Sequence, residues 1–373
     1  MSDERPVYIP LVKGKMWDLK ALGGLSTAAR RSTMPLVEAM PIPKDLSADE
    51  HIEKFSNYVR KFSPLGKIYV DFYGLLPGAV TADGDSAVIA GFQLLKRKGR
   101  IVTPVYGFER DDEVWPKLRE VVVAFGQGFC FRIDIDDLDD MAESTWERVL
   151  QRSAELGLAP AEVDLVIDLR DIREASVESL KDRVVDFIAL KPMRSNFRTI
   201  CVAGSSALKT VTDVPKIGEA DIERKELRLW SALQMDLLGA QEIVFGDYGV
   251  IHPDFIDVGP NKNKNGKIRY TSGVNIRYFR GHSLDLEPKF GQYFEIAARV
   301  RNSPIYKGRD YSFGDLYVDD VANMRDGPGH LGCWVRSDMN HHLEYTAKQM
   351  ERLQAAIQKA SSDEAIDSLL EMA

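Results

Sequence analysis

Short apolar runs typical of β-strands recur about every thirty residues along this chain, each separated from the next by a segment that can form a helix. The runs are Val7–Val12, Met34–Met40, Lys67–Tyr73, Arg100–Phe108, Gly128–Asp136, Val163–Asp168, Phe197–Ala203 and Glu242–Gly246. Strands that alternate with helices over roughly 250 residues predict an α/β fold, a (β/α)8 TIM-type barrel. In that fold the functional side chains stand at the carboxyl ends of the strands, so the sequence indicates where a site would lie.

The segments between these runs carry helix signals. We expect helices over Trp17–Arg31, from Ser47 to near Phe62, and over Ala87–Lys98, Asp111–Phe125, Ser144–Leu156, Val177–Leu190 and Ala220–Leu238. Ser47 and Glu50 form a capping-box pattern, which starts a helix. Glycine directly after a helical pattern, as at Gly99, Gly157 and Gly239, is a typical stop signal.

The regular alternation ends after the eighth run. Residues 251–339 are too many for an ordinary loop. They contain a predicted hairpin, Lys267–Thr271 and Val274–Phe279, and a predicted helix over Phe290–Arg301. Residues 342–360 form a predicted closing helix. We therefore expect a single barrel domain over residues 1–373, with 251–339 as an insertion or lid after strand eight; a small separate C-terminal domain is the alternative.

The charge balance argues against polyanionic partners. The net charge is −8, so the chain as a whole gives no reason to expect strong nucleic-acid binding or attraction to anionic membranes. The basic stretch Lys262–Arg269, together with Arg277 and Arg280, offers local phosphate contacts, but a solvated loop is the preferred interpretation.

Compartment signals point to the cytoplasm. The first residues lack a signal-peptide pattern, and no apolar run approaches the ~20 residues of a membrane span. The 3 cysteines are widely spaced and odd in number, which is typical of buried thiols in a reducing compartment and includes no CxxC pair. We expect a cytoplasmic protein without membrane association.

Charged and polar residues recur where the predicted strands end. They are Lys13, Lys15, Glu38, Asp71, Arg132, Asp134, Asp168, Arg170, Gly204, Ser205, Ser206, Asp247 and Tyr248. Residues two apart on a strand share a face, so an inward orientation would gather them into a polar ring at the barrel mouth. Such groups are costly to bury unless they pair or bind a ligand. The alternative interpretation is structural: helix caps and salt bridges.

These residue types suggest an anion site with carboxylates beside it. Lysines and arginines hold phosphate groups, whereas carboxylates serve as general acids or bases, or as ligands of Mg²⁺ or Mn²⁺. The predicted catalytic residues are Glu38, Asp134, Asp168 and Asp247. The predicted ligand-binding residues are Lys13, Lys15, Asp71, Arg132, Arg170, Gly204, Ser205, Ser206 and Tyr248.

Three alternatives remain at this mouth. Gly204–Ser206 follows strand seven, where many barrels bind phosphate, but an ordinary turn has the same composition. An imine on Lys13 or Lys15 is less favoured than anion binding, because neighbouring carboxylates raise a lysine pKa. A zinc hydrolase is disfavoured, because none of the eight strand ends carries a histidine. No particular metal or cofactor is identified.

Several motifs resemble one family. The opening YIPLVKGK, Asp18-Leu19 and Ala21-Leu22, MPLVEAMP, and the later SFGD, Trp334 and NHHLEYT resemble the beta protein family, named for a T4-type phage protein and found in phages and bacteria. The resemblance covers about Tyr8 to Met350, although family members often carry Glu where Asp18 stands. It implies a barrel-like fold and a setting in mobile elements or phage–host conflict, but no activity and no catalytic residue.

Two functions follow. The first is an enzyme or binding protein that binds or hydrolyses an anionic, phosphate-containing small molecule or nucleotide at the mouth. The second is a non-catalytic scaffold or sensor that binds a ligand or protein partner in a phage-encoded or phage-defence system. Tyr270, Tyr278, Phe279, Tyr293 and Tyr306 would supply its contact surface, unless they pack the insertion onto the barrel. His341 and His342 are expected to cap or pack the last helix, with proton transfer as the alternative.

Overall fold

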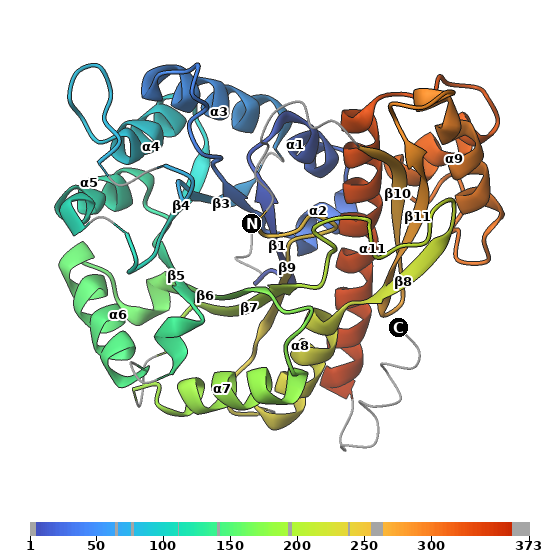
Figure 1. Cartoon of the computed structure of the whole chain (residues 1–373). Coiled ribbons are helices and arrows are strands. Elements are labelled where there is room, and N and C mark those ends of the chain that lie inside the picture. The colour runs from blue at the N-terminus through green and yellow to red at the C-terminus, as the bar shows by residue number, and fades with distance from the viewer. Residues whose placement is uncertain are drawn as a thin grey trace.

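The protein is a closed eight-stranded parallel barrel surrounded by helices (Figure 1). The computed structural model describes residues 5–63, 66–75, 78–110, 112–139, 142–192, 196–237, 239–254 and 264–359. The barrel strands are, in order of pairing, β1 (Tyr8–Lys13), β2 (Leu36–Glu38), β3 (Lys67–Asp71), β4 (Ile101–Tyr106), β5 (Phe129–Asp134), β6 (Val163–Asp171), β7 (Thr199–Ser205) and β9 (Val244–Asp247). The predicted fold class and all eight predicted strands are confirmed.

The register of the barrel decides which side chains share its interior. Lys13 pairs with Glu38, and Glu38 with Asp71, across three neighbouring strands. Ile9, Leu11, Leu36 and Tyr69 lie further toward the amino ends and pack in the inner apolar cluster. Because side chains alternate along each strand, Lys13, Glu38 and Asp71 also point inward, directly above that cluster.

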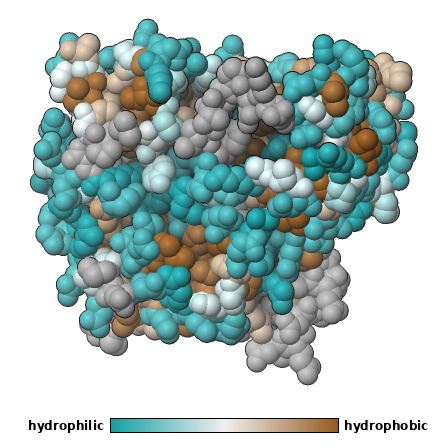
Figure 2. Space-filling view, viewed as in Figure 1, coloured by the Kyte–Doolittle hydropathy of each residue, from teal (hydrophilic) through white to brown (hydrophobic). Residues whose placement is uncertain are grey.

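Helices cover the outside of the barrel. They are α1 (Met16–Gly23), α2 (Thr27–Ser32), α3 (Ala48–Phe62), α4 (Ala87–Arg97), α5 (Trp115–Phe125), α6 (Ala142–Leu156), α7 (Val177–Ala189) and α8 (Lys225–Asp236), with short 3₁₀ turns η1 (Asp112–Val114), η2 (Asp136–Leu138) and η3 (Pro160–Glu162). The capping box at Ser47 forms as predicted. The face seen in Figure 2 is mostly hydrophilic over these helices.

The single helix predicted over Trp17–Arg31 is wrong, because two helices form there. α1 ends at Gly23, and Ser26 starts α2 by accepting a hydrogen bond from the amide of Ala29. A serine that satisfies a free helix-end amide favours a new helix start. The apolar spacing alone did not distinguish one helix from two.

The helix predicted over Ala220–Leu238 is also wrong in its first turn. Residues Glu219–Glu223 form strand β8, and α8 begins only at Lys225. Along β8 the side chains alternate between exposed and half-buried, and Ala220 and Ile222 pack against the small apolar cluster that contains Ile276 and Tyr278. Pairing with a neighbouring strand therefore overrides the helical pattern of this segment.

A small three-stranded sheet stands beside the barrel, in the order β10–β11–β8. β10 (Asn265–Ser272) and β11 (Asn275–Ser283) form the predicted hairpin. The turn η4 (Lys289–Gly291) and helices α9 (Gln292–Asn302) and α10 (Phe313–Ala322) follow. The sheet thus combines a strand from the β7–α8 connection with two strands from the segment after β9.

The last helix joins this sheet to the barrel. α11 (Leu331–Lys359) begins earlier than the predicted residue 342 and packs between α1 on one side and β10 and α10 on the other (Figure 1). The five aromatics proposed as a contact surface mostly pack instead: Tyr270, Tyr278, Phe279 and Tyr293 are buried and Tyr306 is half-buried. No helix in the described part of the chain has both the length and the apolarity to cross a bilayer.

Candidate functional site

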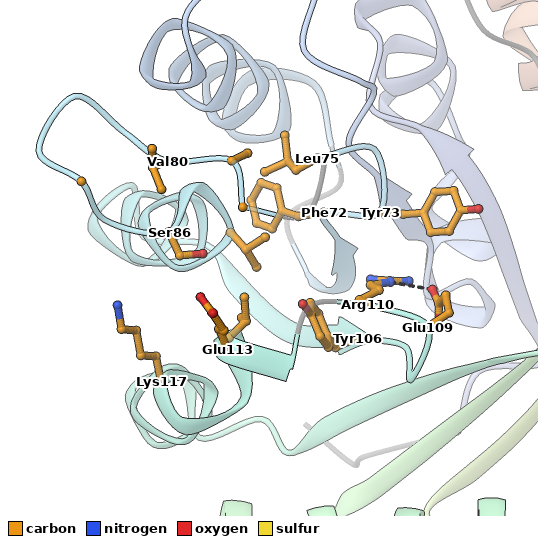
Figure 3. A pocket seen from close by; sticks show the side chains of 15 residues that line it. Phe72, Tyr73, Leu75, Val80, Ser86, Tyr106, Glu109, Arg110, Glu113 and Lys117 are labelled. Carbon is orange, nitrogen blue, oxygen red and sulfur yellow. Dashed lines mark hydrogen bonds and ion pairs between the residues drawn. The ribbon is translucent and has the colours of Figure 1, made fainter.

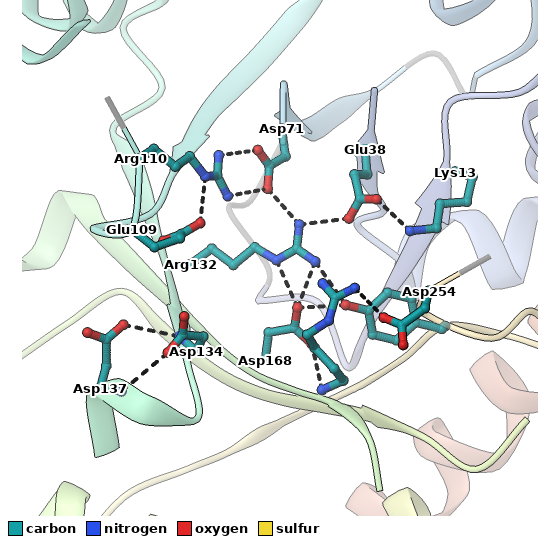
Figure 4. A network of polar contacts seen from close by, with 12 residues as sticks. Lys13, Glu38, Asp71, Glu109, Arg110, Arg132, Asp134, Asp137, Asp168 and Asp254 are labelled. Atoms are coloured by element: carbon teal, nitrogen blue, oxygen red, sulfur yellow. Dashed lines mark hydrogen bonds and ion pairs between the residues drawn. The ribbon is translucent and has the colours of Figure 1, made fainter. Parts of the chain in front are cut away.

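A buried guanidinium lies at the centre of the barrel mouth. Arg132, at the carboxyl end of β5, donates from Nη1 to Oε2 of Glu38 over 2.9 Å and to Oδ2 of Asp71 over 2.7 Å. Its Nε and Nη2 both donate to Oδ2 of Asp168, over 3.0 and 2.6 Å. Figure 4 shows these carboxylates converging on Arg132 from β2, β3 and β6. The predicted inward ring therefore forms at these strands.

Lys13 and Tyr248 complete the network. Nζ of Lys13 lies 2.5 Å from Oε1 of Glu38. The Tyr248 hydroxyl donates to Oδ2 of Asp168 over 2.6 Å and accepts from Nη2 of Arg132 over 2.8 Å. All of these side chains are buried. We call Lys13, Glu38, Asp71, Arg132, Asp168 and Tyr248 the mouth network.

A second arginine, which the strand pattern did not identify, extends the network. Arg110 comes from the loop after β4 and binds both carboxylate oxygens of Asp71, with Nη2 at 3.0 Å from Oδ2. Its Nε donates to Oε1 of Glu109 over 2.8 Å. The only sequence signal was a charged pair soon after a strand end, at Glu109 and Arg110, which is weak because loops are commonly charged.

The electrostatics keep Asp71 ionised and Tyr248 neutral. Burial raises the pKa of the Asp71 carboxyl, but the guanidiniums of Arg110 and Arg132 outweigh it and hold that pKa below its ordinary value. Burial and the neighbouring Asp168 carboxylate raise the pKa of Tyr248. The phenol therefore stays protonated and serves as a hydrogen-bond donor at neutral pH.

Arg170 lies above this network in a different environment. It follows Asp168 on β6 with φ of 54°, in the left-handed region that a residue with a side chain seldom occupies. Its amide donates to Oδ1 of Asp168, and its Nη2 donates to Oδ1 of Asp254 over 2.7 Å. The Arg170 side chain is 30% exposed and that of Asp254 is 46% exposed. This guanidinium is therefore within reach of solvent.

One aromatic ring connects the three guanidiniums. The Tyr73 ring lies 4.9 Å from the guanidinium carbon of Arg132, 5.2 Å from that of Arg110 and 5.3 Å from that of Arg170. These distances suit cation–π contact. Tyr73 is partly exposed, so it covers the network from the solvent side.

Asp134 and Asp247, two of the four predicted catalytic residues, lie outside the mouth network. Asp134 accepts from the backbone amides of Asp136 and Asp137, and burial raises its pKa. Asp247 points to the outer, helix-facing side of β9, where Tyr8 donates to it over 2.6 Å and His342 lies 2.9 Å away. The structure brings Glu38 and Asp168 together at the mouth, but not the other two.

The Gly204–Ser206 turn makes contacts within the protein. Oγ of Ser205 accepts from the amide of Ala207, while Oγ of Ser206 donates to Glu226 and accepts from the amide of Lys225. Both serines are buried. Lys15 occupies the N-cap position of α1 without a side-chain capping hydrogen bond. It attracts the buried carboxyl of Asp18, whose pKa burial raises to about 6.

The two consecutive histidines lie inside α11 rather than at its start. Nδ1 of His341 lies 2.8 Å from Asp315, and Nδ1 of His342 lies 2.7 Å from Oγ1 of Thr271. Both are buried. They tie α11 to α10 and β10, which agrees with the packing role.

The arginines of the basic region proposed for nucleic-acid contact have partners within the protein. Lys262 lies outside the described residues. Arg269 is buried in an ion pair with Asp338, Arg277 pairs with Asp221, and Arg280 donates to the carbonyl of Val214. In the described ranges, no set of three or more histidine, cysteine, aspartate or glutamate side chains is placed to hold a metal ion.

A cavity of about 320 Å³ opens beside the mouth network, between the loops that follow β3 and β4 (Figure 3). Tyr73 and Arg110 form part of its wall. Another cavity, of about 440 Å³ and lined by Lys191 and Trp230 among others, lies near the residues that precede β7 and β9. That is the amino-terminal end of the barrel, which in this fold serves stability rather than function.

Comparison with solved structures finds barrel enzymes at low similarity. A crystal structure described as a mandelate racemase/muconate lactonizing enzyme from Sorangium cellulosum matches with a TM-score of 0.35 and 14% sequence identity. The match covers 74% of this chain and 62% of that one. Alanine racemase from Clostridium difficile 630 matches with a TM-score of 0.32 and 11% sequence identity, over 73% of this chain and 61% of that one. Triosephosphate isomerase from Bartonella henselae matches with a TM-score of 0.31 and 15% sequence identity, over 65% of this chain and 92% of that one.

The chain thus spans about three-fifths of the first two structures it matches. These likenesses are too low to carry function, and the barrel is established by its own strand order. No curated protein matches at the sequence level. The family model described as Beta protein matches residues 8–348, nearly the whole chain. By this match, the chain belongs to the Beta protein family.

Proposed function

We propose that this protein binds a small anionic, phosphate-containing ligand over the carboxyl-terminal mouth of the barrel, with Arg170 as the residue that contacts the anion. The observation that carries the proposal is the strained, solvent-accessible position of Arg170 above a buried charged network. Strained backbone persists where the surrounding structure enforces it and concentrates at functional sites.

The mouth network is better suited to a rigid structural base beneath a bound ligand than to proton transfer. Arg132 engages three carboxylates at once, and the Tyr248 phenol stays protonated. Buried, mutually paired charges hold their geometry because separating them is costly. For this reason we favour binding over hydrolysis. A hydrolytic version of the function would use Glu38 or Asp168, which face the mouth.

Arg170 can exchange its carboxylate partner for a ligand at low cost. Its ion pair with Asp254 is half-exposed, and pairs of that kind contribute little to stability. A phosphate offers the planar guanidinium two parallel acceptors.

The test is a thermal-shift titration with inorganic phosphate, ribose 5-phosphate and nucleotides, each with and without Mg²⁺ or Mn²⁺. A ligand at a hundred times its Kd adds about 2.7 kcal/mol of stability. We expect a shift in the natural protein and its loss in Arg170→Gln. Arg228→Gln, which removes a 66% exposed arginine from another ion pair, is the control. Equal shifts in both variants would contradict the assignment of Arg170.

A second candidate is the non-catalytic scaffold or sensor. Its contacts would come from large apolar side chains that remain exposed in segments next to the small sheet or after α10, at Ile217, Val274, Leu286 and Met324. We place either function in a phage-encoded or phage-defence setting, on the family resemblance, and in the cytoplasm, on the cysteine usage. Two results together would favour the scaffold. No ligand would shift the unfolding temperature, and the protein would capture one defined partner whose binding is abolished by Met324→Asp.

A further inference from the structure

The cavity beside the mouth shares a wall with the proposed anion site. Arg110 lines the cavity and also binds Asp71 of the mouth network. Tyr73 lines the cavity too, and its ring lies against the guanidiniums of both Arg110 and Arg170. The Tyr73 ring therefore lies between Arg170 and the cavity, and a ligand whose anion contacts Arg170 can extend past this ring into the cavity.

The walls of the cavity suit a flat ring. Phe72, Leu75, Val88 and Tyr106 are buried apolar residues that line it. Aromatic and aliphatic walls of this kind hold planar groups by stacking and surface burial. A volume of about 320 Å³ falls in the range of small-molecule sites.

The rim of the cavity is polar. Figure 3 shows Ser86, Glu113 and Lys117 around the space opposite Tyr106. A carboxylate accepts hydrogen bonds from ring N–H and amino groups, whereas an ammonium or hydroxyl donates to ring nitrogens and carbonyls. This combination matches a heteroaromatic ring that carries both donors and acceptors, and not a purely hydrocarbon ring.

We infer that the ligand is a phosphate ester of a heteroaromatic nucleoside, with its base in this cavity and its phosphate at Arg170. The inference rests on the proposed function and adds the class of ligand to it. Arg110 is an unsuitable phosphate contact, because Asp71 and Glu109 already engage its guanidinium. Arg170 therefore binds the phosphate, and the cavity binds the base.

Calorimetric titration of the full chain separates the two parts. The probes are adenosine and guanosine monophosphate, ribose 5-phosphate and inorganic phosphate. We expect at least one nucleotide to bind tenfold or more tightly than ribose 5-phosphate. Equal affinity for nucleotides and ribose 5-phosphate would overturn the inference and leave the proposed function standing. Failure of every probe would overturn the proposed function itself.

A cavity-filling variant tests the location. Ser86 is half-buried and makes no capping hydrogen bond at the start of α4, so Ser86→Phe adds a ring without removing a cap. We expect this variant to lose the nucleotide advantage while its affinity for ribose 5-phosphate is unchanged. Val123→Phe, at a 71% exposed position on α5, is the matched control and should bind like the natural protein.

A second variant guards against a folding defect in the first. Val80 lines the same cavity but is largely exposed, so Val80→Trp is compatible with the fold and should reduce nucleotide affinity in the same selective way. Retention of the full nucleotide advantage in both folded variants would show that the base lies elsewhere and would overturn the inference.

Discussion

Nε and Nη2 of Arg132 donate to a single atom, Oδ2 of Asp168, across the mouth of the barrel. The remaining nitrogen of the guanidinium, Nη1, bridges Glu38 and Asp71. One buried cation therefore compensates carboxylates from three strands. This arrangement fixes the relative positions of β2, β3, β5 and β6 where they end, and its removal should be felt by the whole barrel.

Replacing Arg132 by methionine should destabilise the protein by about 3–5 kcal/mol, because three buried carboxylates lose their shared partner. Urea denaturation at neutral pH measures the change in the free energy of unfolding. Arg228→Met, at an exposed ion pair, is the control and should stay within about 0.5 kcal/mol. If Arg132→Met lost as little unfolding free energy as the control, the mouth network would not contribute to the stability of the barrel.

Acid should weaken the protein through Asp247. Burial raises the pKa of this carboxyl, but His342, Arg224 and Tyr8 outweigh burial and lower it from 3.8 to about 2. The folded state thus binds a proton less readily than the unfolded state, so the stability is present above pH 4 and is lost as the pH falls toward 2. The shift corresponds to about 2 kcal/mol.

Unfolding free energies measured between pH 5 and pH 2 check this. Asp247→Asn should be less stable than the natural protein at pH 5, and its stability should fall less steeply below pH 4. Parallel curves for the two proteins over this range would contradict the assignment. Asp254→Asn, at a half-exposed carboxylate, serves as the control.

Glu226 should show the opposite dependence. Burial raises its pKa from 4.5 to about 7, against the attraction of Arg224. The folded state therefore holds a proton that the unfolded state has released, and this contribution to stability is full below pH 4.5 and is lost as the pH rises through 7. Glu226→Gln removes the titration and keeps an acceptor for the Ser206 hydroxyl, which lies 2.7 Å away.

We expect Glu226→Gln to be more stable than the natural protein at pH 8, by about 1–3 kcal/mol, and to differ little at pH 5. Thermal or urea denaturation at the two pH values measures both differences. A variant that is less stable at pH 8 would show that the ionised carboxylate, paired with Arg224, is the native form.

The strand pattern predicted much of the barrel and part of the mouth network. Inward-facing Lys13, Glu38 and Arg132 were found because side chains alternate along a strand and charge is rare in a barrel interior. Asp247 was placed wrongly at the mouth because β9 is buried on both faces, so a polar residue there signals no particular side. Its partners, Tyr8 and His342, come from the two ends of the chain.

Residues on loops cannot be placed from the sequence for a related reason. Arg110 reaches Asp71 from a loop, and loops have no periodicity from which a direction can be read. The residues of β8 have a helical pattern, and they form a strand because they pair with β11, a contact between distant segments that the local sequence does not reveal. The partly exposed position of Arg170 depends on a positive φ, which the residue type does not predict.

That backbone conformation gives the last prediction. At φ of 54° a Cβ atom is disfavoured by about 1–2 kcal/mol, and glycine escapes this penalty. Arg170→Gly should therefore be more stable than Arg170→Ala by about 1 kcal/mol, although both lose the guanidinium and should lose the phosphate-induced thermal shift. The same pair at Met324, which has φ of 55° and is 75% exposed, should show the same stability difference with the ligand shift intact. Equal stability of the glycine and alanine variants at 170, beside a clear difference at 324, would mean that Arg170 is not strained. Its backbone conformation would then give no support to a role in ligand binding.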